Sequence, residues 1–343
     1  MAVGPSGREL SYVLPLRRWQ IAQDDELADY LGWLAGRVEV IVVDGSADEV
    51  FAGHRRQFGH LVRHIPVDPG FTGRYGKVNG VNTGIRAAGN ERVVVADDDV
   101  RYDAAGLERM AGLLDHADVV RPQNYFEPLP WHARWDTART LLNRAFAADY
   151  PGTLGLRRSR LLAAGGYDGD CLFENLELMR TVEVAGGRVV APLDFYVRRL
   201  PPSSRHFWSQ RVRQAYDDFA LPGRLAAELA VLPGVGGMLL RRRPAALVGL
   251  AAAAVGAAEV GRRRAGGTRI YPPSCSLFAP LWLAERGVCA WMAVWLRLAR
   301  GGVPYAGATL SKAANSKRVL RRRMAAATAA GARPTHGSGG GGR

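Results

Sequence analysis

Three consecutive carboxylates, Asp97, Asp98 and Asp99, directly follow an apolar, β-branched segment at residues 92–96. Carboxylates this close repel one another unless a cation lies among them. Their hard oxygen atoms suit Mg²⁺ or Mn²⁺, which bridge readily to phosphate groups. The triplet therefore predicts a divalent-metal site for a phosphorylated ligand, while a solvated acidic turn remains the structural alternative.

A second polar turn, Asp44, Gly45 and Ser46, follows another apolar segment at residues 38–43. A carboxylate in this place can accept hydrogen bonds from a nucleobase or a ribose, and a glycine permits close approach of the ligand. Asp, Gly and Ser are equally typical of an ordinary turn. The tripeptide alone leaves both interpretations open.

The elements that must position these turns alternate between strand and helix. Apolar, β-branched runs predict strands at residues 10–16, 38–43, 61–67 and 92–96. Helical spacing of apolar residues lies at 24–33, 77–88, 104–114 and 131–147. This alternation predicts an α/β fold with a Rossmann-like, mostly parallel sheet and helices on both faces. Ligands of such sheets bind beyond the carboxyl ends of the strands, where both polar turns lie.

These segments, in this order, resemble family 2 glycosyltransferases of the GT-A fold over roughly residues 8–220. Residues 10–15 look like the family's first strand, residues 44–46 like its nucleotide-contacting turn, and residues 76–82 like its GKxxAxN segment with Gly80 in place of alanine. Residues 97–99 match its DxD motif. The resemblance implies a metal-dependent hexosyltransferase that uses a nucleotide-diphosphate sugar, foremost a UDP-sugar, with Asp97 and Asp99 binding the metal. The donor contacts that it implies in this part of the chain are Pro15, Asp44, Gly45, Lys77, Asn82, Asp97, Asp98 and Asp99.

The same resemblance places residues 173–178 (FENLEL) at the family's ED motif, where a helix begins beside the acceptor. In inverting members a carboxylate of this motif deprotonates the acceptor hydroxyl. Asn175 occupies the second position and cannot act as a base, so Glu174 or Glu177 must take the role, with Glu174 favoured. The ENLE segment also resembles one in retaining polypeptide N-acetylgalactosaminyltransferases, which leaves the stereochemistry open. Stabilising acids at a helix N-terminus are the structural alternative.

Residues 210–214 (QRVRQ) look like the QxxRW motif of membrane-linked family 2 enzymes, with Gln214 in place of tryptophan. Gln210 and Arg213 would then contact the diphosphate, since a guanidinium fork matches its oxygen atoms. His206 would be a third metal ligand, as a downstream histidine often is in GT-A enzymes, or else a plain surface residue. Loss of the tryptophan favours single additions over processive synthesis.

Composition limits the partners. The 343 residues carry 46 Lys+Arg against 32 Asp+Glu, a net charge of +14, with arginine triplets at 241–243, 262–264 and 321–323. Because the triplets flank apolar runs, they favour an anionic membrane surface over nucleic acid. Three widely spaced cysteines without metal-binding spacing indicate a reducing compartment. Residues 1–20 lack the apolar core of a signal peptide, which predicts a cytoplasmic start.

Apolar runs dominate the chain after Pro222, at residues 225–240, 244–258 and 274–296. Each is short or interrupted compared with the roughly 20 apolar residues of a membrane span. Interfacial helices, a tight hairpin, interrupted spans and a soluble helical domain all remain open. We expect a catalytic domain at 1–222, a helical, membrane-associated region at 223–324 and a disordered tail at 325–343.

Taken together, the sequence predicts an enzyme at the cytoplasmic face of the cell membrane. It would add one sugar to a lipid-linked or polysaccharide acceptor in cell-envelope biosynthesis. Two alternatives remain. A catalytically inactive, sugar-nucleotide-binding membrane protein would explain Asn175 and Gln214. A nucleotidyltransferase on a related fold would need a glycine-rich signature that is missing after residue 16.

Overall fold

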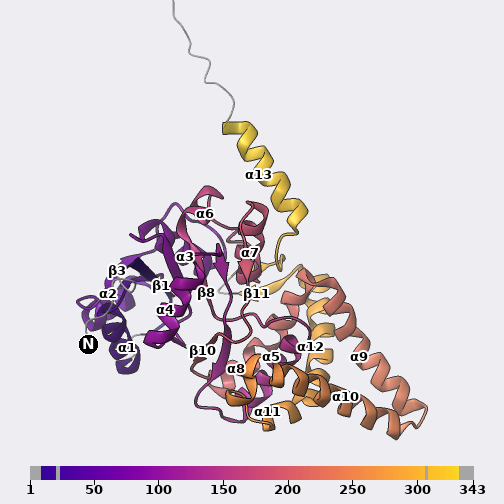
Figure 1. Cartoon of the computed structure of the whole chain (residues 1–343). Coiled ribbons are helices and arrows are strands. Elements are labelled where there is room, and N and C mark those ends of the chain that lie inside the picture. The colour runs from indigo at the N-terminus through magenta and orange to yellow at the C-terminus, as the bar shows by residue number, and fades with distance from the viewer. Residues whose placement is uncertain (1–8, 21–23, 306–307, 332–343) are drawn as a thin grey trace, which may run out of the picture.

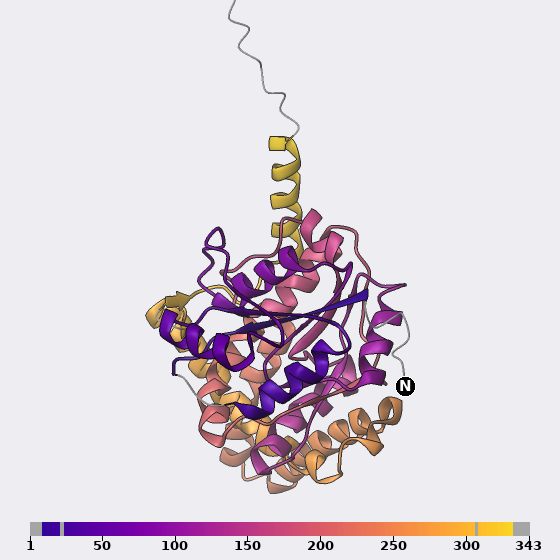
Figure 2. The same cartoon turned by 90° about the vertical axis from the view of Figure 1, so that its left-hand side faces the viewer.

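The computed structural model describes residues 9–20, 24–305 and 308–331. A seven-stranded sheet lies at its centre, with the strand order β3-β2-β1-β4-β8-β6-β9 (Figures 1 and 2). The strands are β1 (Leu10–Leu16), β2 (Glu39–Asp44), β3 (Arg63–Pro66), β4 (Arg92–Ala96), β6 (Val119–Val120), β8 (Thr153–Arg157) and β9 (Val189–Val190). Strand β8 is antiparallel to both neighbours, and the remaining pairs of this sheet are parallel. The predicted mostly parallel α/β sheet is confirmed.

Successive residues of β1 face opposite sides of the sheet, so each side has its own core. Tyr12 and Leu14 belong to one core, and Val13 belongs to the other. Helices on the first side are α1 (Asp25–Ala35), α2 (Asp48–Phe58) and α4 (Ala104–Leu113). Those on the second side are α3 (Gly76–Ala87), α6 (Arg158–Ala163) and α7 (Glu174–Val184). Helices therefore cover both faces, as predicted.

A second sheet, of three strands, begins directly after the acidic triplet. It has the order β5-β10-β7 and consists of β5 (Val100–Arg101), β10 (Tyr196–Arg199) and β7 (Gln123–Phe126). Strand β5 starts at the residue after Asp99, and its antiparallel register with β10 pairs Val100 with Arg199. This pairing brings Arg199 beside the triplet.

The C-terminal helices pack against the rest of the protein through α5 (Trp131–Phe146). They are α8 (Ser204–Tyr216), η2 (Asp217–Ala220), α9 (Pro222–Leu240), α10 (Pro244–Arg263), η3 (Arg264–Arg269), α11 (Ser274–Leu277) and α12 (Ala279–Arg300). A third core joins α5, α10, α11 and α12 around Leu141, Tyr271 and Trp282. Gly261 of α10 lies so close to α5 that a Cβ atom there would be 1.8 Å from the carbonyl oxygen of Leu141. The C-terminal half of α10, which holds its buried residues, thus packs against α5.

The chain then returns to the sheet domain through the hairpin β11 (Val303–Tyr305) and β12 (Ala308–Leu310), and ends in α13 (Lys317–Gly331). Helix α13 projects from the body at the end away from α9 and α10 (Figures 1 and 2). The prediction of a disordered tail from residue 325 is wrong as far as Gly331, because the alanines of residues 325–330 have high helix propensity. Residues 332–343 lie outside the described residues.

Candidate active site

A pocket of about 900 Å³ opens at the carboxyl ends of β1, β2 and β4. Pro15 and Leu16 line it from β1, Val43 and Gly45 from the end of β2, and the acidic triplet from the end of β4. This is the edge of the sheet where an α/β fold binds ligands. The residues from our predicted set that line it are Pro15, Gly45, Lys77, Asp97, Asp98, Asp99, Glu174, His206, Gln210 and Arg213.

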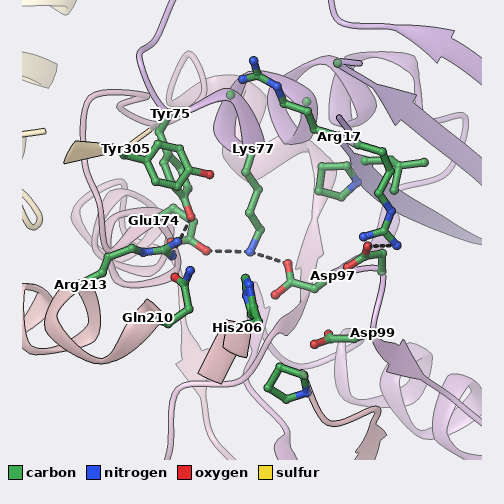
Figure 3. Close-up of a pocket in the computed structure, with 18 of the residues that line it drawn as sticks. Arg17, Tyr75, Lys77, Asp97, Asp99, Glu174, His206, Gln210, Arg213 and Tyr305 are labelled. Carbon is green, nitrogen blue, oxygen red and sulfur yellow. Dashed lines mark hydrogen bonds and ion pairs between the residues drawn. The ribbon is translucent and has the colours of Figure 1, made fainter. Parts of the chain in front are cut away.

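Lys77 lies at the middle of the pocket, in the first turn of α3 (Figure 3). Its Nζ is 2.5 Å from Asp97 Oδ1 and 2.7 Å from Glu174 Oε1. Burial disfavours the ammonium, but the charges of Asp97 and Glu174 outweigh it and hold the pKa of Lys77 well above its usual value. A permanent positive charge therefore joins the predicted metal site to the predicted base.

Arginines hold the other carboxylates of the triplet. Arg199 Nε is 2.8 Å from Asp99 Oδ2, its Nη2 is 3.5 Å from Asp97 Oδ2, and Arg18 Nη2 is 2.6 Å from Asp98 Oδ2. Burial raises the pKa of Asp99, and the charges of Asp97 and Asp98 raise it further, against the opposing effect of Arg199. The sequence reasoning missed Arg199 and Arg18. Only the pairing of β5 with β10 brings Arg199 here, and no motif marks it.

The donor atoms of the pocket fit a divalent metal. Asp97 and Asp99 offer hard carboxylate oxygen atoms, which Mg²⁺ and Mn²⁺ prefer. Burial is the main cause of the raised pKa of Asp99, and the charges of Asp97 and Asp98 add to it, so a further cation beside Asp99 would favour its charged form. The ring of His206 lies in the same pocket (Figure 3). Burial, with help from Arg213, lowers the pKa of His206, which favours the neutral imidazole that ligates metals.

Glu174 and Asn175 begin α7 but face different surroundings. Glu174 is 7% exposed and lines the pocket. The Asn175 side chain donates a hydrogen bond from Nδ2 to the carbonyl oxygen of Pro151, at 2.8 Å. Glu174 therefore points into the pocket, whereas Asn175 anchors the helix to a neighbouring loop.

The structure contradicts Glu177 as an alternative base. Its side chain is fully buried and lies outside the pocket lining. Both carboxylate oxygens accept hydrogen bonds from Asn315: the backbone N donates to Oε2 and the side-chain Nδ2 to Oε1, each at 2.6 Å. Glu177 lies three residues after Glu174, which is about 300° around the helix and not a full turn. Its side chain therefore faces the segment between β12 and α13.

Asp44, which the sequence predicts to contact the nucleotide, does not line the pocket. Its Oδ2 is 2.7 Å from His54 Nδ1 and 3.1 Å from His64 Nε2, and its Oδ1 accepts a hydrogen bond from the backbone N of Ser46 at 2.9 Å. These hydrogen bonds outweigh burial and hold the pKa of Asp44 far below its usual range. Asp44 thus shapes the turn that presents Gly45 to the pocket.

Asn82, likewise predicted to contact the donor, lies outside the pocket lining. Its Nδ2 donates a hydrogen bond to the carbonyl oxygen of Tyr167 at 3.2 Å. It packs against Gly166, whose φ of +87° favours glycine and whose Cβ position would be 2.9 Å from Asn82 Oδ1. Asn82 therefore anchors the loop of residues 165–170.

Arg213 and Gln210 reach the pocket from α8, on the same side as Glu174 (Figure 3). Arg213 Nη2 donates a hydrogen bond to the hydroxyl oxygen of Tyr75 at 3.1 Å. Its guanidinium carbon lies 5.7 Å from the ring centroid of Tyr75 and 5.2 Å from that of Tyr305. The sequence reasoning missed both tyrosines. Tyr305 in particular reaches the pocket from the far end of the chain.

Residues 27–172 match the family model described as Glycosyl transferase family 2. No curated protein matches the chain. One solved structure of similar fold is the mannosyltransferase PcManGT from Pyrobaculum calidifontis in complex with GDP-Man and Mn²⁺. It is 21% identical with a TM-score of 0.48, and the match covers 84% of this chain and 89% of that chain.

Two other solved structures are similar to this chain over less of its length. S. aureus TarS in complex with UDP-GlcNAc is 16% identical with a TM-score of 0.40, covering 59% of this chain and 61% of that chain. The glucosyl-3-phosphoglycerate synthase from Mycobacterium tuberculosis, in complex with Mn²⁺, uridine-diphosphate and glucosyl-3-phosphoglycerate, is 19% identical with a TM-score of 0.40. That match covers 61% of this chain and 78% of that chain.

Proposed function

We propose that the protein is a nucleotide-sugar-dependent glycosyltransferase, because residues 27–172 match the family model described as Glycosyl transferase family 2 and the pocket lies at the carboxyl ends of the strands. The protein transfers one sugar from a nucleotide-diphosphate sugar to a lipid-linked or polysaccharide acceptor at the cytoplasmic face of the cell membrane. The observation that carries the proposal is the convergence of Lys77, Asp97 and Glu174 in one pocket, where Lys77 is within ion-pair distance of both carboxylates.

The donor would lie along the carboxyl edge of the sheet. Pro15 and Gly45 line the end of the pocket at β1 and β2, where the nucleoside would bind, and a UDP-sugar is the first donor to test. Asp97 and Asp99, with His206, would hold Mg²⁺ or Mn²⁺. A divalent metal at this place supplies positive charge to the leaving diphosphate.

Cationic side chains complement the charge of the departing diphosphate. Lys77 and Arg213 both line the pocket, and Gln210 lies beside Arg213 (Figure 3). Fixed charges of this kind lower the barrier because they need no reorganisation when negative charge develops. We assign Arg213 and Lys77 to the diphosphate, and Gln210 to a hydrogen bond with it.

Glu174 is our candidate general base. The acceptor hydroxyl gives its proton to the carboxylate as its oxygen forms a bond to the anomeric carbon, and the bond from that carbon to the diphosphate breaks. The ion pair with Lys77, at 2.7 Å, fixes the orientation of this carboxylate. A single displacement inverts the anomeric centre. Gln214 stands in the place of the motif's tryptophan, which supports one addition for each encounter.

The C-terminal helices support membrane association. Two helices in the described part of the chain, Pro222–Leu240 and Pro244–Arg269, are long and apolar enough to cross a membrane. Only 11% and 17% of their most apolar stretches, respectively, are buried in the protein. Helix α12 adds exposed side chains with helical spacing on one face, Leu281, Val288, Met292 and Trp295. Because half of α10 packs on α5, we favour a surface that lies in the lipid interface over a span.

Release of nucleoside diphosphate tests the proposal. Wild-type protein would be incubated with UDP-, GDP- and dTDP-sugars and a membrane lipid extract, with Mn²⁺ or with EDTA. We expect metal-dependent release from one donor. Binding of a donor without release would instead support the catalytically inactive binder, and a folded protein that binds none of the donors would overturn the proposal.

A further inference from the structure

We propose that Asn315 and Tyr305 are positioning residues of the active site, supplied by the C-terminal segment, which we define as residues 303–305 and 308–315. The inference rests on the proposed function, because the side chains that they position are the base Glu174 and the diphosphate ligand Arg213. The C-terminal segment follows the apolar helices, yet its contacts are with the catalytic pocket and with α7.

Asn315 fixes the first turn of α7. Its backbone N and its Nδ2 hold the two oxygens of Glu177, each at 2.6 Å. The same Nδ2 is 2.8 Å from Asp168 Oδ2 and 3.3 Å from Cys171 Sγ. Asn315 is 5% exposed, so water does not replace these bonds easily. One side chain therefore joins the loop before α7 to the helix itself, three residues after Glu174.

Backbone pairing reinforces the same contact. The carbonyl oxygen of Lys312 accepts a hydrogen bond from the backbone N of Leu172 at 3.0 Å, and that of Ala313 accepts one from Phe173 at 2.8 Å. These bonds end at the residue before Glu174. The C-terminal segment thus holds the chain on both sides of the proposed base.

Tyr305 completes the other half of the site. Its ring centroid is 4.5 Å from that of Tyr75, which lies immediately before Gly76 and Lys77 in the chain. Both rings flank the guanidinium of Arg213, and Tyr75 also accepts its hydrogen bond. Removal of the Tyr305 ring would leave the arginine with one aromatic neighbour and free to move.

Displacement of a catalytic group by about 1 Å can cost roughly 10²-fold in rate. The C-terminal segment should therefore affect turnover more than donor binding. A purely structural role would instead lower the melting temperature and leave kcat of the folded protein unchanged. The two roles can be separated experimentally.

The test compares Asn315→Ala with Lys317→Ala. The control removes the Lys317–Glu183 ion pair of 2.8 Å, which joins the start of α13 to the same helix α7 but is partly exposed. We expect Asn315→Ala to lower kcat by about 10²-fold with the dissociation constant for the donor unchanged, and the control to match wild type. Tyr305→Phe should keep the rate and Tyr305→Ala should lower it.

Hydrogen exchange of the peptide that covers residues 171–178 provides a second readout that does not depend on turnover. Asn315→Ala should exchange faster there than wild type or Lys317→Ala. If wild type releases no nucleoside diphosphate from any donor, the proposed function fails, and this exchange still decides the positioning role of Asn315. Wild-type kcat and wild-type exchange in Asn315→Ala would overturn the inference.

Discussion

Lys77 sets the electrostatics of the pocket, because one ammonium group pairs with Asp97 and with Glu174. The sequence predicted Lys77 and Asp97 as donor contacts and Glu174 as the favoured base, each from a separate motif. It could not predict the pairing, since Lys77 and Glu174 lie 97 residues apart. Asp44, Asn82 and Glu177 do not line the pocket. The sequence could not show this, because a motif gives the residue type but not the direction in which its side chain points.

Substitution of Glu174 by glutamine tests the base directly. Glu174→Gln keeps the size of the side chain but cannot accept the acceptor's proton, so we expect kcat to fall by about 10²- to 10⁴-fold. Donor affinity, measured by titration calorimetry, should change little. Glu183→Gln, on the same helix and 34% exposed, is the matched control. Full activity of Glu174→Gln would remove Glu174 from the mechanism.

The buried carboxyl group of Asp217 should make the stability of the protein depend on pH. Burial raises the pKa of Asp217 from 3.8 to about 8, and within the described residues its Oδ1 has no hydrogen-bond partner. A carboxyl group with a raised pKa binds its proton more tightly in the folded state, so folding stability falls as pH rises from about 4 to about 8. For one such group, the free energy of unfolding falls by at most about 1.4 kcal/mol per pH unit.

Asp217→Asn mimics the protonated form and should remove that loss. Urea unfolding at pH 6 and pH 9 would measure the free energy of unfolding of both proteins. We expect wild type to lose more stability than the variant between these two values. The same loss in both proteins would show that Asp217 does not carry the effect.

At the scale of elements, local pattern decides what could be predicted. Strands β1 and β4 coincide with apolar runs, and α3, α4 and α5 begin and end within one residue of the predicted ranges. The strands β5, β7, β10, β11 and β12 have two to four residues each and depend on pairing between distant segments. Such short runs carry no period, so Arg199 and Tyr305 could not be predicted.

The packing of α3 on the sheet gives an element-scale prediction. A Cβ atom on Gly84 would lie 2.2 Å from Val13 Cγ1 in β1. Gly84→Ala should therefore separate α3 from the sheet and lower the free energy of unfolding by about 1–3 kcal/mol. Gly112→Ala, in α4 with open space around it, should not lower it. Equal stability of the two variants in urea unfolding would contradict this packing argument.

At the scale of the whole molecule, the three arginine triplets lie in different surroundings. Residues 241–243 are exposed at the turn between α9 and α10. Arg262 pairs with Glu259, and Arg264 donates hydrogen bonds to the carbonyl oxygens of residues 144 and 145. Arg323, on α13 at the other end of the molecule, pairs with Asp168 (Figure 1). The first triplet lies exposed between the two apolar helices α9 and α10.

We therefore expect the first triplet to bind anionic membranes. Substitution of all three of Arg241, Arg242 and Arg243 by glutamine should weaken binding to vesicles that contain phosphatidylglycerol by about 10²-fold, at roughly 1 kcal/mol per arginine near the surface. Arg321→Gln with Arg322→Gln, exposed on α13, is the matched control and should bind as wild type does. Sedimentation with vesicles measures both. Equal loss in the two variants would contradict an oriented membrane surface.

The most direct test of the central claim is release of nucleoside diphosphate by wild type and by Asp99→Asn, measured with the one donor that wild type accepts, in the presence of Mn²⁺. The Asp99 carboxylate lines the pocket and would hold the metal. We predict metal-dependent release by wild type and its loss in a folded Asp99→Asn protein. Undiminished release by Asp99→Asn would contradict the assignment of this pocket as a metal-dependent glycosyltransferase site.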